Sequence, residues 1–186
     1  MRLKLYNIMS TLFHPYNGAL LIDETIHDEI FSFFNINIGD EEKIKNIKME
    51  FMADKGYTLK NIEKTDYIFT FSAMLFSEKF VDSVGEVLKD EIKFFPCKII
   101  CKGVYLDWYS AQIKHFIPIV DKELSVYEID EDGELDFEFV KFREDFEQPF
   151  YVAADSEDIG GFVVTDLFQK LCEDHNLMVG FRDAFI

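Results

Sequence analysis

The stretch SEKFVDSVGEVLKDEIKFFPCKIICKG, Ser77–Gly103, changes its hydrophobic period partway along. Its first part has an apolar stripe at helical spacing, which predicts a helix over 77–92 with Ser77 as the N-cap. From Lys93 onward, aromatic and β-branched residues followed by a glycine are typical of a strand. A helix and strands in separate runs indicate an α+β protein. The stripe consists of Phe80, Val81, Val84, Val87, Leu88 and Ile92.

Helical and strand patterns also separate elsewhere in the chain. Asp23 is the expected N-cap of an amphipathic run over 23–34, and Asp166 with Gln169 resembles a capping box before a further run that ends at Asn176. The sequence therefore predicts mostly antiparallel sheets with about three amphipathic helices. The predicted strands cover 2–9, two runs within 44–71, 93–113, 115–120, a short run before Thr165 and a final one after Gly180.

Length and composition limit the number of domains. The chain has 186 residues, of which 48% are hydrophobic and 21 are Phe. Such a chain can bury a substantial core, and it is far richer in aromatic residues than a disordered acidic segment. We expect one α+β domain over 1–186, or two lobes that divide it into 1–71 and 72–186.

The formal net charge is −17, and it is spread unevenly. Residues 1–93 hold 16 acidic and 11 basic side chains, whereas residues 94–186 hold 20 and 8. Nucleic acids and anionic membranes bind clustered Lys and Arg, so this balance argues against both as partners. A partner selected by charge would be basic, although solubility alone also accounts for an acidic surface.

The sequence predicts a cytoplasmic protein. No apolar run reaches the roughly 18 residues that a membrane span requires, and polar residues interrupt the N-terminal apolar stretch, which argues against a signal peptide. The three cysteines, Cys97, Cys101 and Cys172, are odd in number. On a strand, the first two would lie about 13 Å apart, too far for a disulfide or a shared metal ion. We expect all three to be buried thiols.

No catalytic motif accompanies this composition. The chain lacks a G-x-S-x-G, an H-E-x-x-H and a P-loop, and Gly160-Gly161 lacks the rest of a phosphate-binding loop. The four histidines fall in separate predicted elements. We therefore expect neither enzyme activity nor a cofactor. An enzyme with an unrecognised acidic site stays open as an alternative, because 36 acids make chance pairs of carboxylates frequent.

The stretch SVYEIDEDGELDFEF, Ser125–Phe139, partly matches a calcium-binding loop. The twelfth position of such a loop needs a bidentate Glu, and here it is Phe139. The flanks alternate with period two, whereas an EF-hand needs two helices. A calcium-binding module is therefore a weaker alternative. The matching positions are Glu128, Asp130, Asp132, Gly133, Leu135 and Asp136.

A β-hairpin explains this stretch better. A two-residue loop would mix apolar and acidic side chains on both faces of the hairpin. A three-residue loop, Glu131-Asp132-Gly133, instead separates them, with Gly133 in the left-handed conformation. One face then becomes apolar and is expected to face the core. Its predicted cross-strand pairs are Ile129 with Leu135, Tyr127 with Phe137, and Ser125 with Phe139.

The opposite face of the predicted hairpin is acidic. Like charges directly opposite each other destabilise a hairpin, within the roughly 0.2–1 kcal/mol scale of cross-strand pairs. Two interpretations follow: the acids discourage pairing with other sheet edges, or they meet a cationic partner. The candidate partner-binding residues are Glu128, Asp130, Asp132, Glu134, Asp136 and Glu138.

The order of elements in the second half is similar to that of bacterial polymorphic-toxin immunity proteins of the immunity protein 11 and immunity protein 43 type. Their ending, a strand, Ser/Thr-Asp, an amphipathic helix, Asn-Leu, Gly and Phe, resembles Phe162–Phe181 here. An Asp followed by a Ser-bearing strand resembles Asp121–Ser125. The resemblance covers about residues 72–186. The segments that carry it are SEKFVDSV, FFPCKI, YLDWY, VDKELSVYEID and FVVTDLFQKLCEDHNLMVGF.

This resemblance implies a cytoplasmic protein without catalysis that binds and blocks one cognate toxin domain. It supplies no catalytic or toxin-facing residues to transfer. The acidic composition fits a basic toxin such as a nuclease, because complementary charge speeds encounter. We therefore expect an immunity protein, with the enzyme and the calcium-binding module as alternatives.

Overall fold

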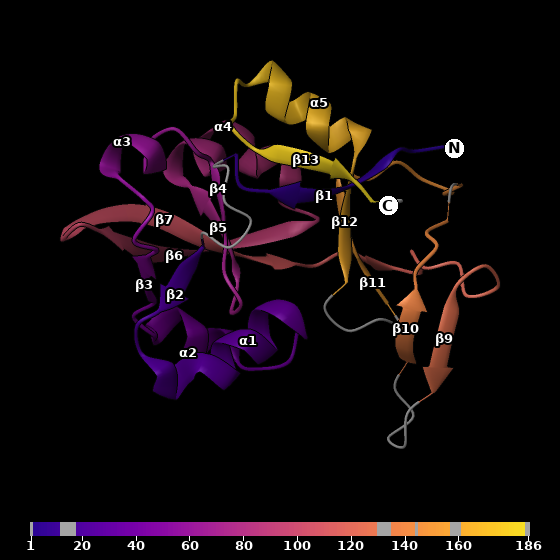
Figure 1. Cartoon of the computed structure of the whole chain (residues 1–186), viewed down its shortest axis with the longest axis horizontal. Helices are drawn as coiled ribbons and strands as arrows, with labels where there is room; N and C mark the ends of the chain where they lie inside the picture. Colours follow the sequence, from indigo (N-terminus) through magenta and orange to yellow (C-terminus); the bar gives the residue numbers. More distant parts are fainter. Residues whose placement is uncertain (1, 12–17, 130–134, 144, 157–160, 185–186) are drawn as a thin grey trace.

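A computed structural model describes residues 2–11, 18–129, 135–143, 145–156 and 161–184, and it has the α+β class that the sequence predicts (Figure 1). The strands are β1 (Leu5–Met9), β2 (Ala19–Leu21), β3 (Glu50–Ala53), β4 (Tyr67–Phe69), β5 (Met74–Ser77), β6 (Ile92–Cys101), β7 (Val104–Ile113), β8 (Phe116–Ile117), β9 (Val126–Ile129), β10 (Leu135–Phe139), β11 (Val152–Asp155), β12 (Phe162–Thr165) and β13 (Gly180–Asp183). The helices are the 3-10 turn η1 (Glu24–Ile26), α1 (His27–Asn35), α2 (Glu41–Asn46), α3 (Leu59–Ile62), α4 (Glu78–Leu88) and α5 (Asp166–Asp174).

The larger sheet has the strand order β2-β3-β6-β7-β5-β4. Its centre is the long antiparallel pair of β6 and β7, which runs from Ile92↔Ile113 to Cys101↔Val104. Lys102 and Gly103 join them with φ angles of 51° and 81°, as a two-residue type I′ turn requires. Strand β3 pairs only with 98–100 of β6, so Pro96 has a ladder neighbour on one side alone among the described strands.

The smaller sheet has the order β13-β1-β12-β11-β8. Strand β1, near the N-terminus, pairs antiparallel with β12 and β13 from the C-terminal part, and β8 joins β11 in parallel. Both sheets therefore combine strands from before and after residue 71. A division at 71 would pass through both sheets.

Apolar side chains pack on both faces of the larger sheet. On one face, Phe33 and Phe34 of α1 contact Phe95 of β6, with ring centroids 5.2 and 5.4 Å apart. On the other face, the ring centroids of Phe80 in α4 and Phe168 in α5 lie 6.0 Å apart, in a core cluster that also includes residues of the smaller sheet. Figure 1 shows this layering, with α1 on one side of β6 and β7 and with α4 and α5 on the other.

The structure confirms the predicted helices near residues 23, 77 and 166. The side chain of Asp23 accepts from Thr25 N, and Ser77 Oγ accepts from Phe80 N at 3.0 Å, so both residues cap as predicted. The predicted capping box is wrong: Thr165 is the N-cap of α5, and its hydroxyl donates to Phe150 O instead. No helix among the described residues is long and apolar enough to cross a membrane.

Two short helices replace part of the strand predicted within 44–71. Helix α2 ends at Asn46 and β3 begins only at Glu50, and α3 lies between β3 and β4. In α2 only Ile44 is buried, so no apolar stripe marked the helix in the sequence. Two residues of the stripe predicted for α4 do not belong to its buried face. Val87 is 49% exposed, and Ile92 lies beyond the helix, in β6.

The three cysteines are buried and free, as expected from their number and spacing. Burial raises the pKa of the Cys97 and Cys172 thiols to about 12 in each case. A thiol becomes a nucleophile only as the thiolate, so these cysteines act as apolar core residues.

Candidate protein-binding surface

The acidic stretch forms the predicted hairpin, and most of its register is confirmed. Ile129 pairs with Leu135 and Tyr127 with Phe137, as the three-residue loop required. The rings of Tyr127 and Phe137 lie 5.4 Å apart. The loop itself, 130–134, lies outside the described residues.

The third predicted pair is wrong. Phe139 pairs with Val126, where Ser125 was expected, because the register shifts by a bulge between Phe137 and Phe139. The bulge places Phe139 beside Val126, on the face that carries Glu128. Phe139 and Val126 are 55% and 51% exposed. The face expected to be purely acidic therefore also carries an exposed apolar pair.

The expected core face is also wrong. Strands β9 and β10 form a two-stranded sheet of their own and join neither large sheet (Figure 1). Ile129 is 67% exposed, and Tyr127 is only partly buried. The alternation of apolar residues predicted the register correctly as far as the bulge, because it depends on local pairing. It could not show that the hairpin would form a sheet separate from the two large ones.

The structure places three of the six candidate partner-binding residues. Glu128 and Glu138 are exposed, and the backbone of Asp136 pairs with that of Glu128. Like charges therefore occupy opposite positions, as predicted. The other three, Asp130, Asp132 and Glu134, lie outside the described residues, together with Gly133 of the proposed calcium loop.

The base of the hairpin is tied together by Ser125. Its hydroxyl donates to Lys141 O at 3.3 Å and accepts from Lys141 N at 2.9 Å. The backbone of Asp121 bonds to Ser125 and Lys141, and its carboxylate accepts from the amides of the following turn. Asp121 and Ser125, which carried part of the family resemblance, thus fix where the hairpin begins.

Asp155 holds this base on the smaller sheet. One oxygen of its carboxylate accepts from both Ile119 N and Val120 N, each at 2.7 Å. Val120 in turn bridges to Phe142, on the chain that leaves the hairpin. Asp155 lies at the end of β11 and is only 6% exposed. It is therefore a positioning residue for the hairpin, and nothing in the sequence separated it from the other acids.

Two more carboxylates with little exposure hold the backbone in the same way. Asp66 accepts from Met178 N at 2.7 Å and from Ser77 Oγ at 2.5 Å. Glu91 accepts from Tyr151 N and Val152 N at 2.8 and 2.7 Å. Both acids come from the larger sheet or its connections, and both hold segments next to strands of the smaller sheet. These contacts are structural and give no support to an acidic catalytic site.

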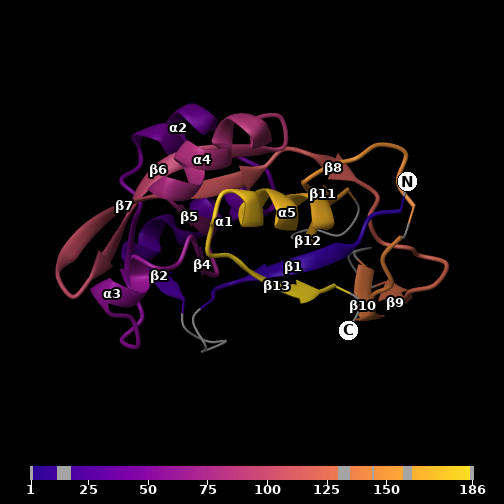
Figure 2. The ribbon, with the colours of Figure 1, turned by 90° about the horizontal axis from the view of Figure 1, so that it is seen from above.

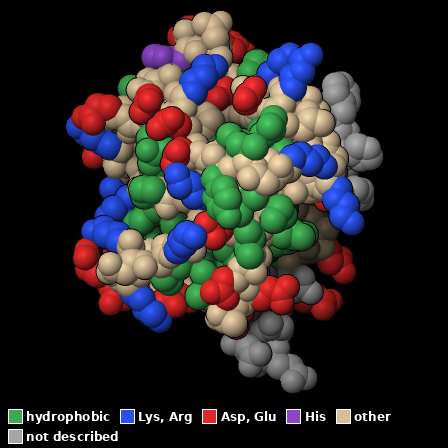
Figure 3. Space-filling view, turned by 90° about the vertical axis from the view of Figure 1, so that its left-hand side faces the viewer, with side chains coloured by type: hydrophobic (Ala, Val, Ile, Leu, Met, Phe, Trp, Pro, Cys, Tyr) green, Lys and Arg blue, Asp and Glu red, His purple; other side chains and the backbone are tan. Residues whose placement is uncertain are grey.

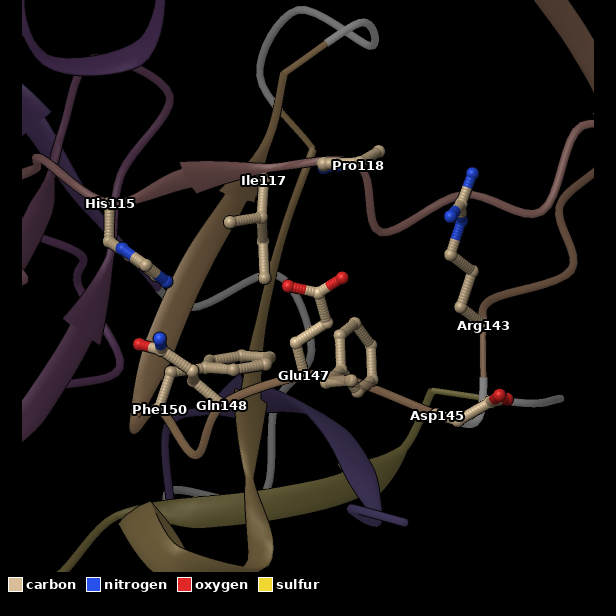
Figure 4. Close-up of a pocket in the computed structure, with 9 residues that line it drawn as sticks. His115, Ile117, Pro118, Arg143, Asp145, Glu147, Gln148 and Phe150 are labelled. Atoms are coloured by element: carbon tan, nitrogen blue, oxygen red, sulfur yellow. The ribbon is translucent and has the colours of Figure 1, made fainter. Parts of the chain in front are cut away.

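A cavity of about 400 Å³ lies beside the hairpin base. His115 and Phe150 both line it, with their rings tilted by 43° and their ring centroids 5.8 Å apart. Figure 4 shows that the side chains of Arg143, Asp145 and Glu147 point in different directions and do not converge on one point. Arg143 donates to Val120 O at 3.4 Å. The cavity thus has the residue types of a polar site without the convergent geometry that catalysis requires.

The described residues contain no group of three or more His, Cys, Asp or Glu side chains that could hold a metal ion.

On the face in Figure 3, acidic side chains alternate with Lys and Arg around hydrophobic side chains in the middle. On this face the charges of both signs are mixed, so charge alone does not mark a binding region there. No protein-family model and no curated protein matches the chain.

Proposed function

We propose that this protein is a cytoplasmic immunity protein that binds a cognate bacterial toxin domain and neutralises it by direct occlusion. The toxin domain would be basic, as nucleases are. The observation that supports this proposal best is the β9–β10 hairpin. It extends from the two large sheets, places like charges opposite each other and exposes apolar side chains, none of which stabilises the fold.

The hairpin has the composition of a protein-binding surface. Phe139 and Val126 supply exposed apolar area, and Glu128 and Glu138 supply negative charge beside it. Interfaces commonly combine aromatic anchors with a polar rim. Charged rims chiefly raise the rate of association with a partner of opposite charge. A basic toxin domain with an apolar side chain at its surface would match both the negative charge and the exposed apolar area of the hairpin. The order of elements in the second half, which resembles the immunity families, supports the same proposal.

Co-expression with the toxin domain encoded next to this chain's gene tests the proposal. Cells that express the toxin domain should survive only when this chain is present, and the purified proteins should form a complex. Equal killing with and without this chain would show that the proposal is wrong.

Charge reversal on the hairpin tests the binding surface. We expect Glu128→Lys with Glu138→Lys to lower the association rate about tenfold at low salt, with a smaller effect at high salt, because screening already weakens the attraction. The matched control is Glu63→Lys with Glu173→Lys, which makes the same change in net charge at exposed positions on other elements. Equal effects of the two variants would mean that only net charge matters and that the hairpin does not bind.

A further inference from the structure

A second exposed apolar surface lies where the two edges of the larger sheet approach each other. We name it the β2–β4 surface, and it consists of Leu20, Met52, Phe69 and Phe71, which are 64%, 45%, 47% and 72% exposed. Leu20 and Met52 are cross-strand partners. The rings of Phe69 and Phe71 lie 5.5 Å apart, edge to face. The four side chains belong to β2, β3, β4 and the residues that follow β4.

Curling of the sheet brings these residues together. Strands β2 and β4 are the outermost strands of the order β2-β3-β6-β7-β5-β4, so a flat sheet would keep them far apart. Instead, Gly18 lies against the carbonyl oxygen of Phe69, and a Cβ at this position would overlap that oxygen. Glycine therefore permits the close approach of the two edges.

Leu20 and Phe71 line a cavity of about 370 Å³ at this surface. The charged side chains that line it are acidic, Glu24 and Asp28, with His27 between them in sequence. The chain has no Lys or Arg between Lys4 and Lys43, although this segment contains seven Asp and Glu residues. The cavity thus joins an apolar wall to an acidic rim.

This arrangement points to a particular kind of occupant. Soluble monomers seldom expose several large apolar side chains side by side, and such patches commonly mark interaction sites. The acidic rim disfavours an acidic partner and favours one with Lys or Arg beside an apolar side chain. A second copy of this acidic chain would place like charges together at the rim. Charge complementarity therefore selects a basic polypeptide.

We propose that the β2–β4 surface is a second contact site for the basic toxin domain. It receives an apolar side chain of the toxin domain in the cavity, and Glu24 and Asp28 meet the cationic residues that flank this side chain. This inference rests on the proposed function for the identity of the partner. Strand β2 and the hairpin lie in opposite halves of the molecule (Figures 1 and 2), so a toxin domain that contacts both is held at two separate points.

Two variants separate the roles of the apolar wall and the acidic rim. Leu20→Ala with Phe71→Ala should weaken toxin binding about 10- to 100-fold, mainly through faster dissociation and at all salt concentrations, because buried apolar anchors carry much of the affinity of an interface. Glu24→Lys with Asp28→Lys should weaken binding chiefly at low salt, since salt screens exposed charges. Both kinetic constants can be measured by surface plasmon resonance with the neighbouring toxin domain.

The control is Val87→Ala with Met178→Ala, which removes two apolar side chains that are each 49% exposed on other parts of the surface. Leu20→Ala with Phe71→Ala and the control should unfold near the temperature of the wild type, because the substituted side chains are largely exposed. Glu24→Lys with Asp28→Lys should unfold at a slightly lower temperature, because it places cations in the first turns of η1 and α1. No binding by the wild type would contradict the proposed function itself. Normal wild-type binding that Leu20→Ala with Phe71→Ala leaves unchanged would overturn the second contact alone. Self-association in light scattering that disappears in the same variant would show that a second copy occupies the surface, which would also overturn the inference.

Discussion

Replacement of Asp155 tests whether one buried carboxylate positions the hairpin. The carboxylate accepts two short bonds from Ile119 N and Val120 N, and these residues are only 1% and 4% exposed. A hydrogen bond to a charged group contributes about 1.5–3 kcal/mol, and a buried donor without a partner costs a similar amount. We therefore expect Asp155→Ala to lower the free energy of unfolding by about 3–5 kcal/mol. Urea unfolding measures this loss as a lower midpoint.

Asp155→Asn separates the effect of charge from that of shape. Its amide oxygen still accepts hydrogen bonds, but neutral bonds are about half as strong as those to a charged group, so the expected loss is about 1–2 kcal/mol. Amide exchange should also become faster at the hairpin base in Asp155→Ala, notably at Ser125 and Lys141. A loss below about 1 kcal/mol for Asp155→Ala, within the error of extrapolated unfolding energies, would refute this role. Wild-type stability of Asp155→Asn would show that an oxygen acceptor alone is sufficient and that the charge of the carboxylate does not matter.

Two further predictions concern the core. Ser77→Ala removes both the N-cap of α4 and a hydrogen-bond donor to Asp66, so it should lower the free energy of unfolding by about 2–3 kcal/mol. The control, Ser83→Ala on the same helix, should change the free energy of unfolding little. A loss for Ser77→Ala no larger than that for Ser83→Ala would contradict the capping role. Burial raises the pKa of the Cys97 and Cys172 thiols to about 12, so at pH 8 both should resist a thiol-specific reagent such as DTNB in the folded protein and react in denaturant. Rapid labelling of the folded protein at either cysteine would contradict their burial.

Local sequence patterns predicted the parts of the fold that depend on neighbouring residues. Ser77 marked the start of α4 because its hydroxyl can reach an amide three residues later. The alternation around Gly133 predicted the pairing of Tyr127 with Phe137, because a shift by one residue would have moved every side chain to the other face. Helix α2 was not predicted because Ile44 is its only buried residue, so its sequence has no apolar stripe.

The candidate sites could be predicted only in part. The acids of the hairpin were visible as a run, but the bulge that brings Phe139 beside Val126 was not. The β2–β4 surface left no local signal, because Leu20 and Phe71 are far apart in the sequence and meet only where the sheet curls. The roles of Asp66, Glu91 and Asp155 were equally hidden, since 36 acids look alike in the sequence and the backbone amides that bind these three come from distant segments.

The sequence by itself determined the α+β class, the main helices, the pairing of the acidic hairpin near its loop and the burial of the cysteines. These features follow from hydrophobic period, capping and turn chemistry, which act over a few residues. Only the tertiary structure decided that β1 joins β12 and β13, that the hairpin forms a sheet of its own and that two sheet edges meet at Gly18. Those outcomes depend on how distant segments pack, and local patterns do not record which distant partner a buried face will meet.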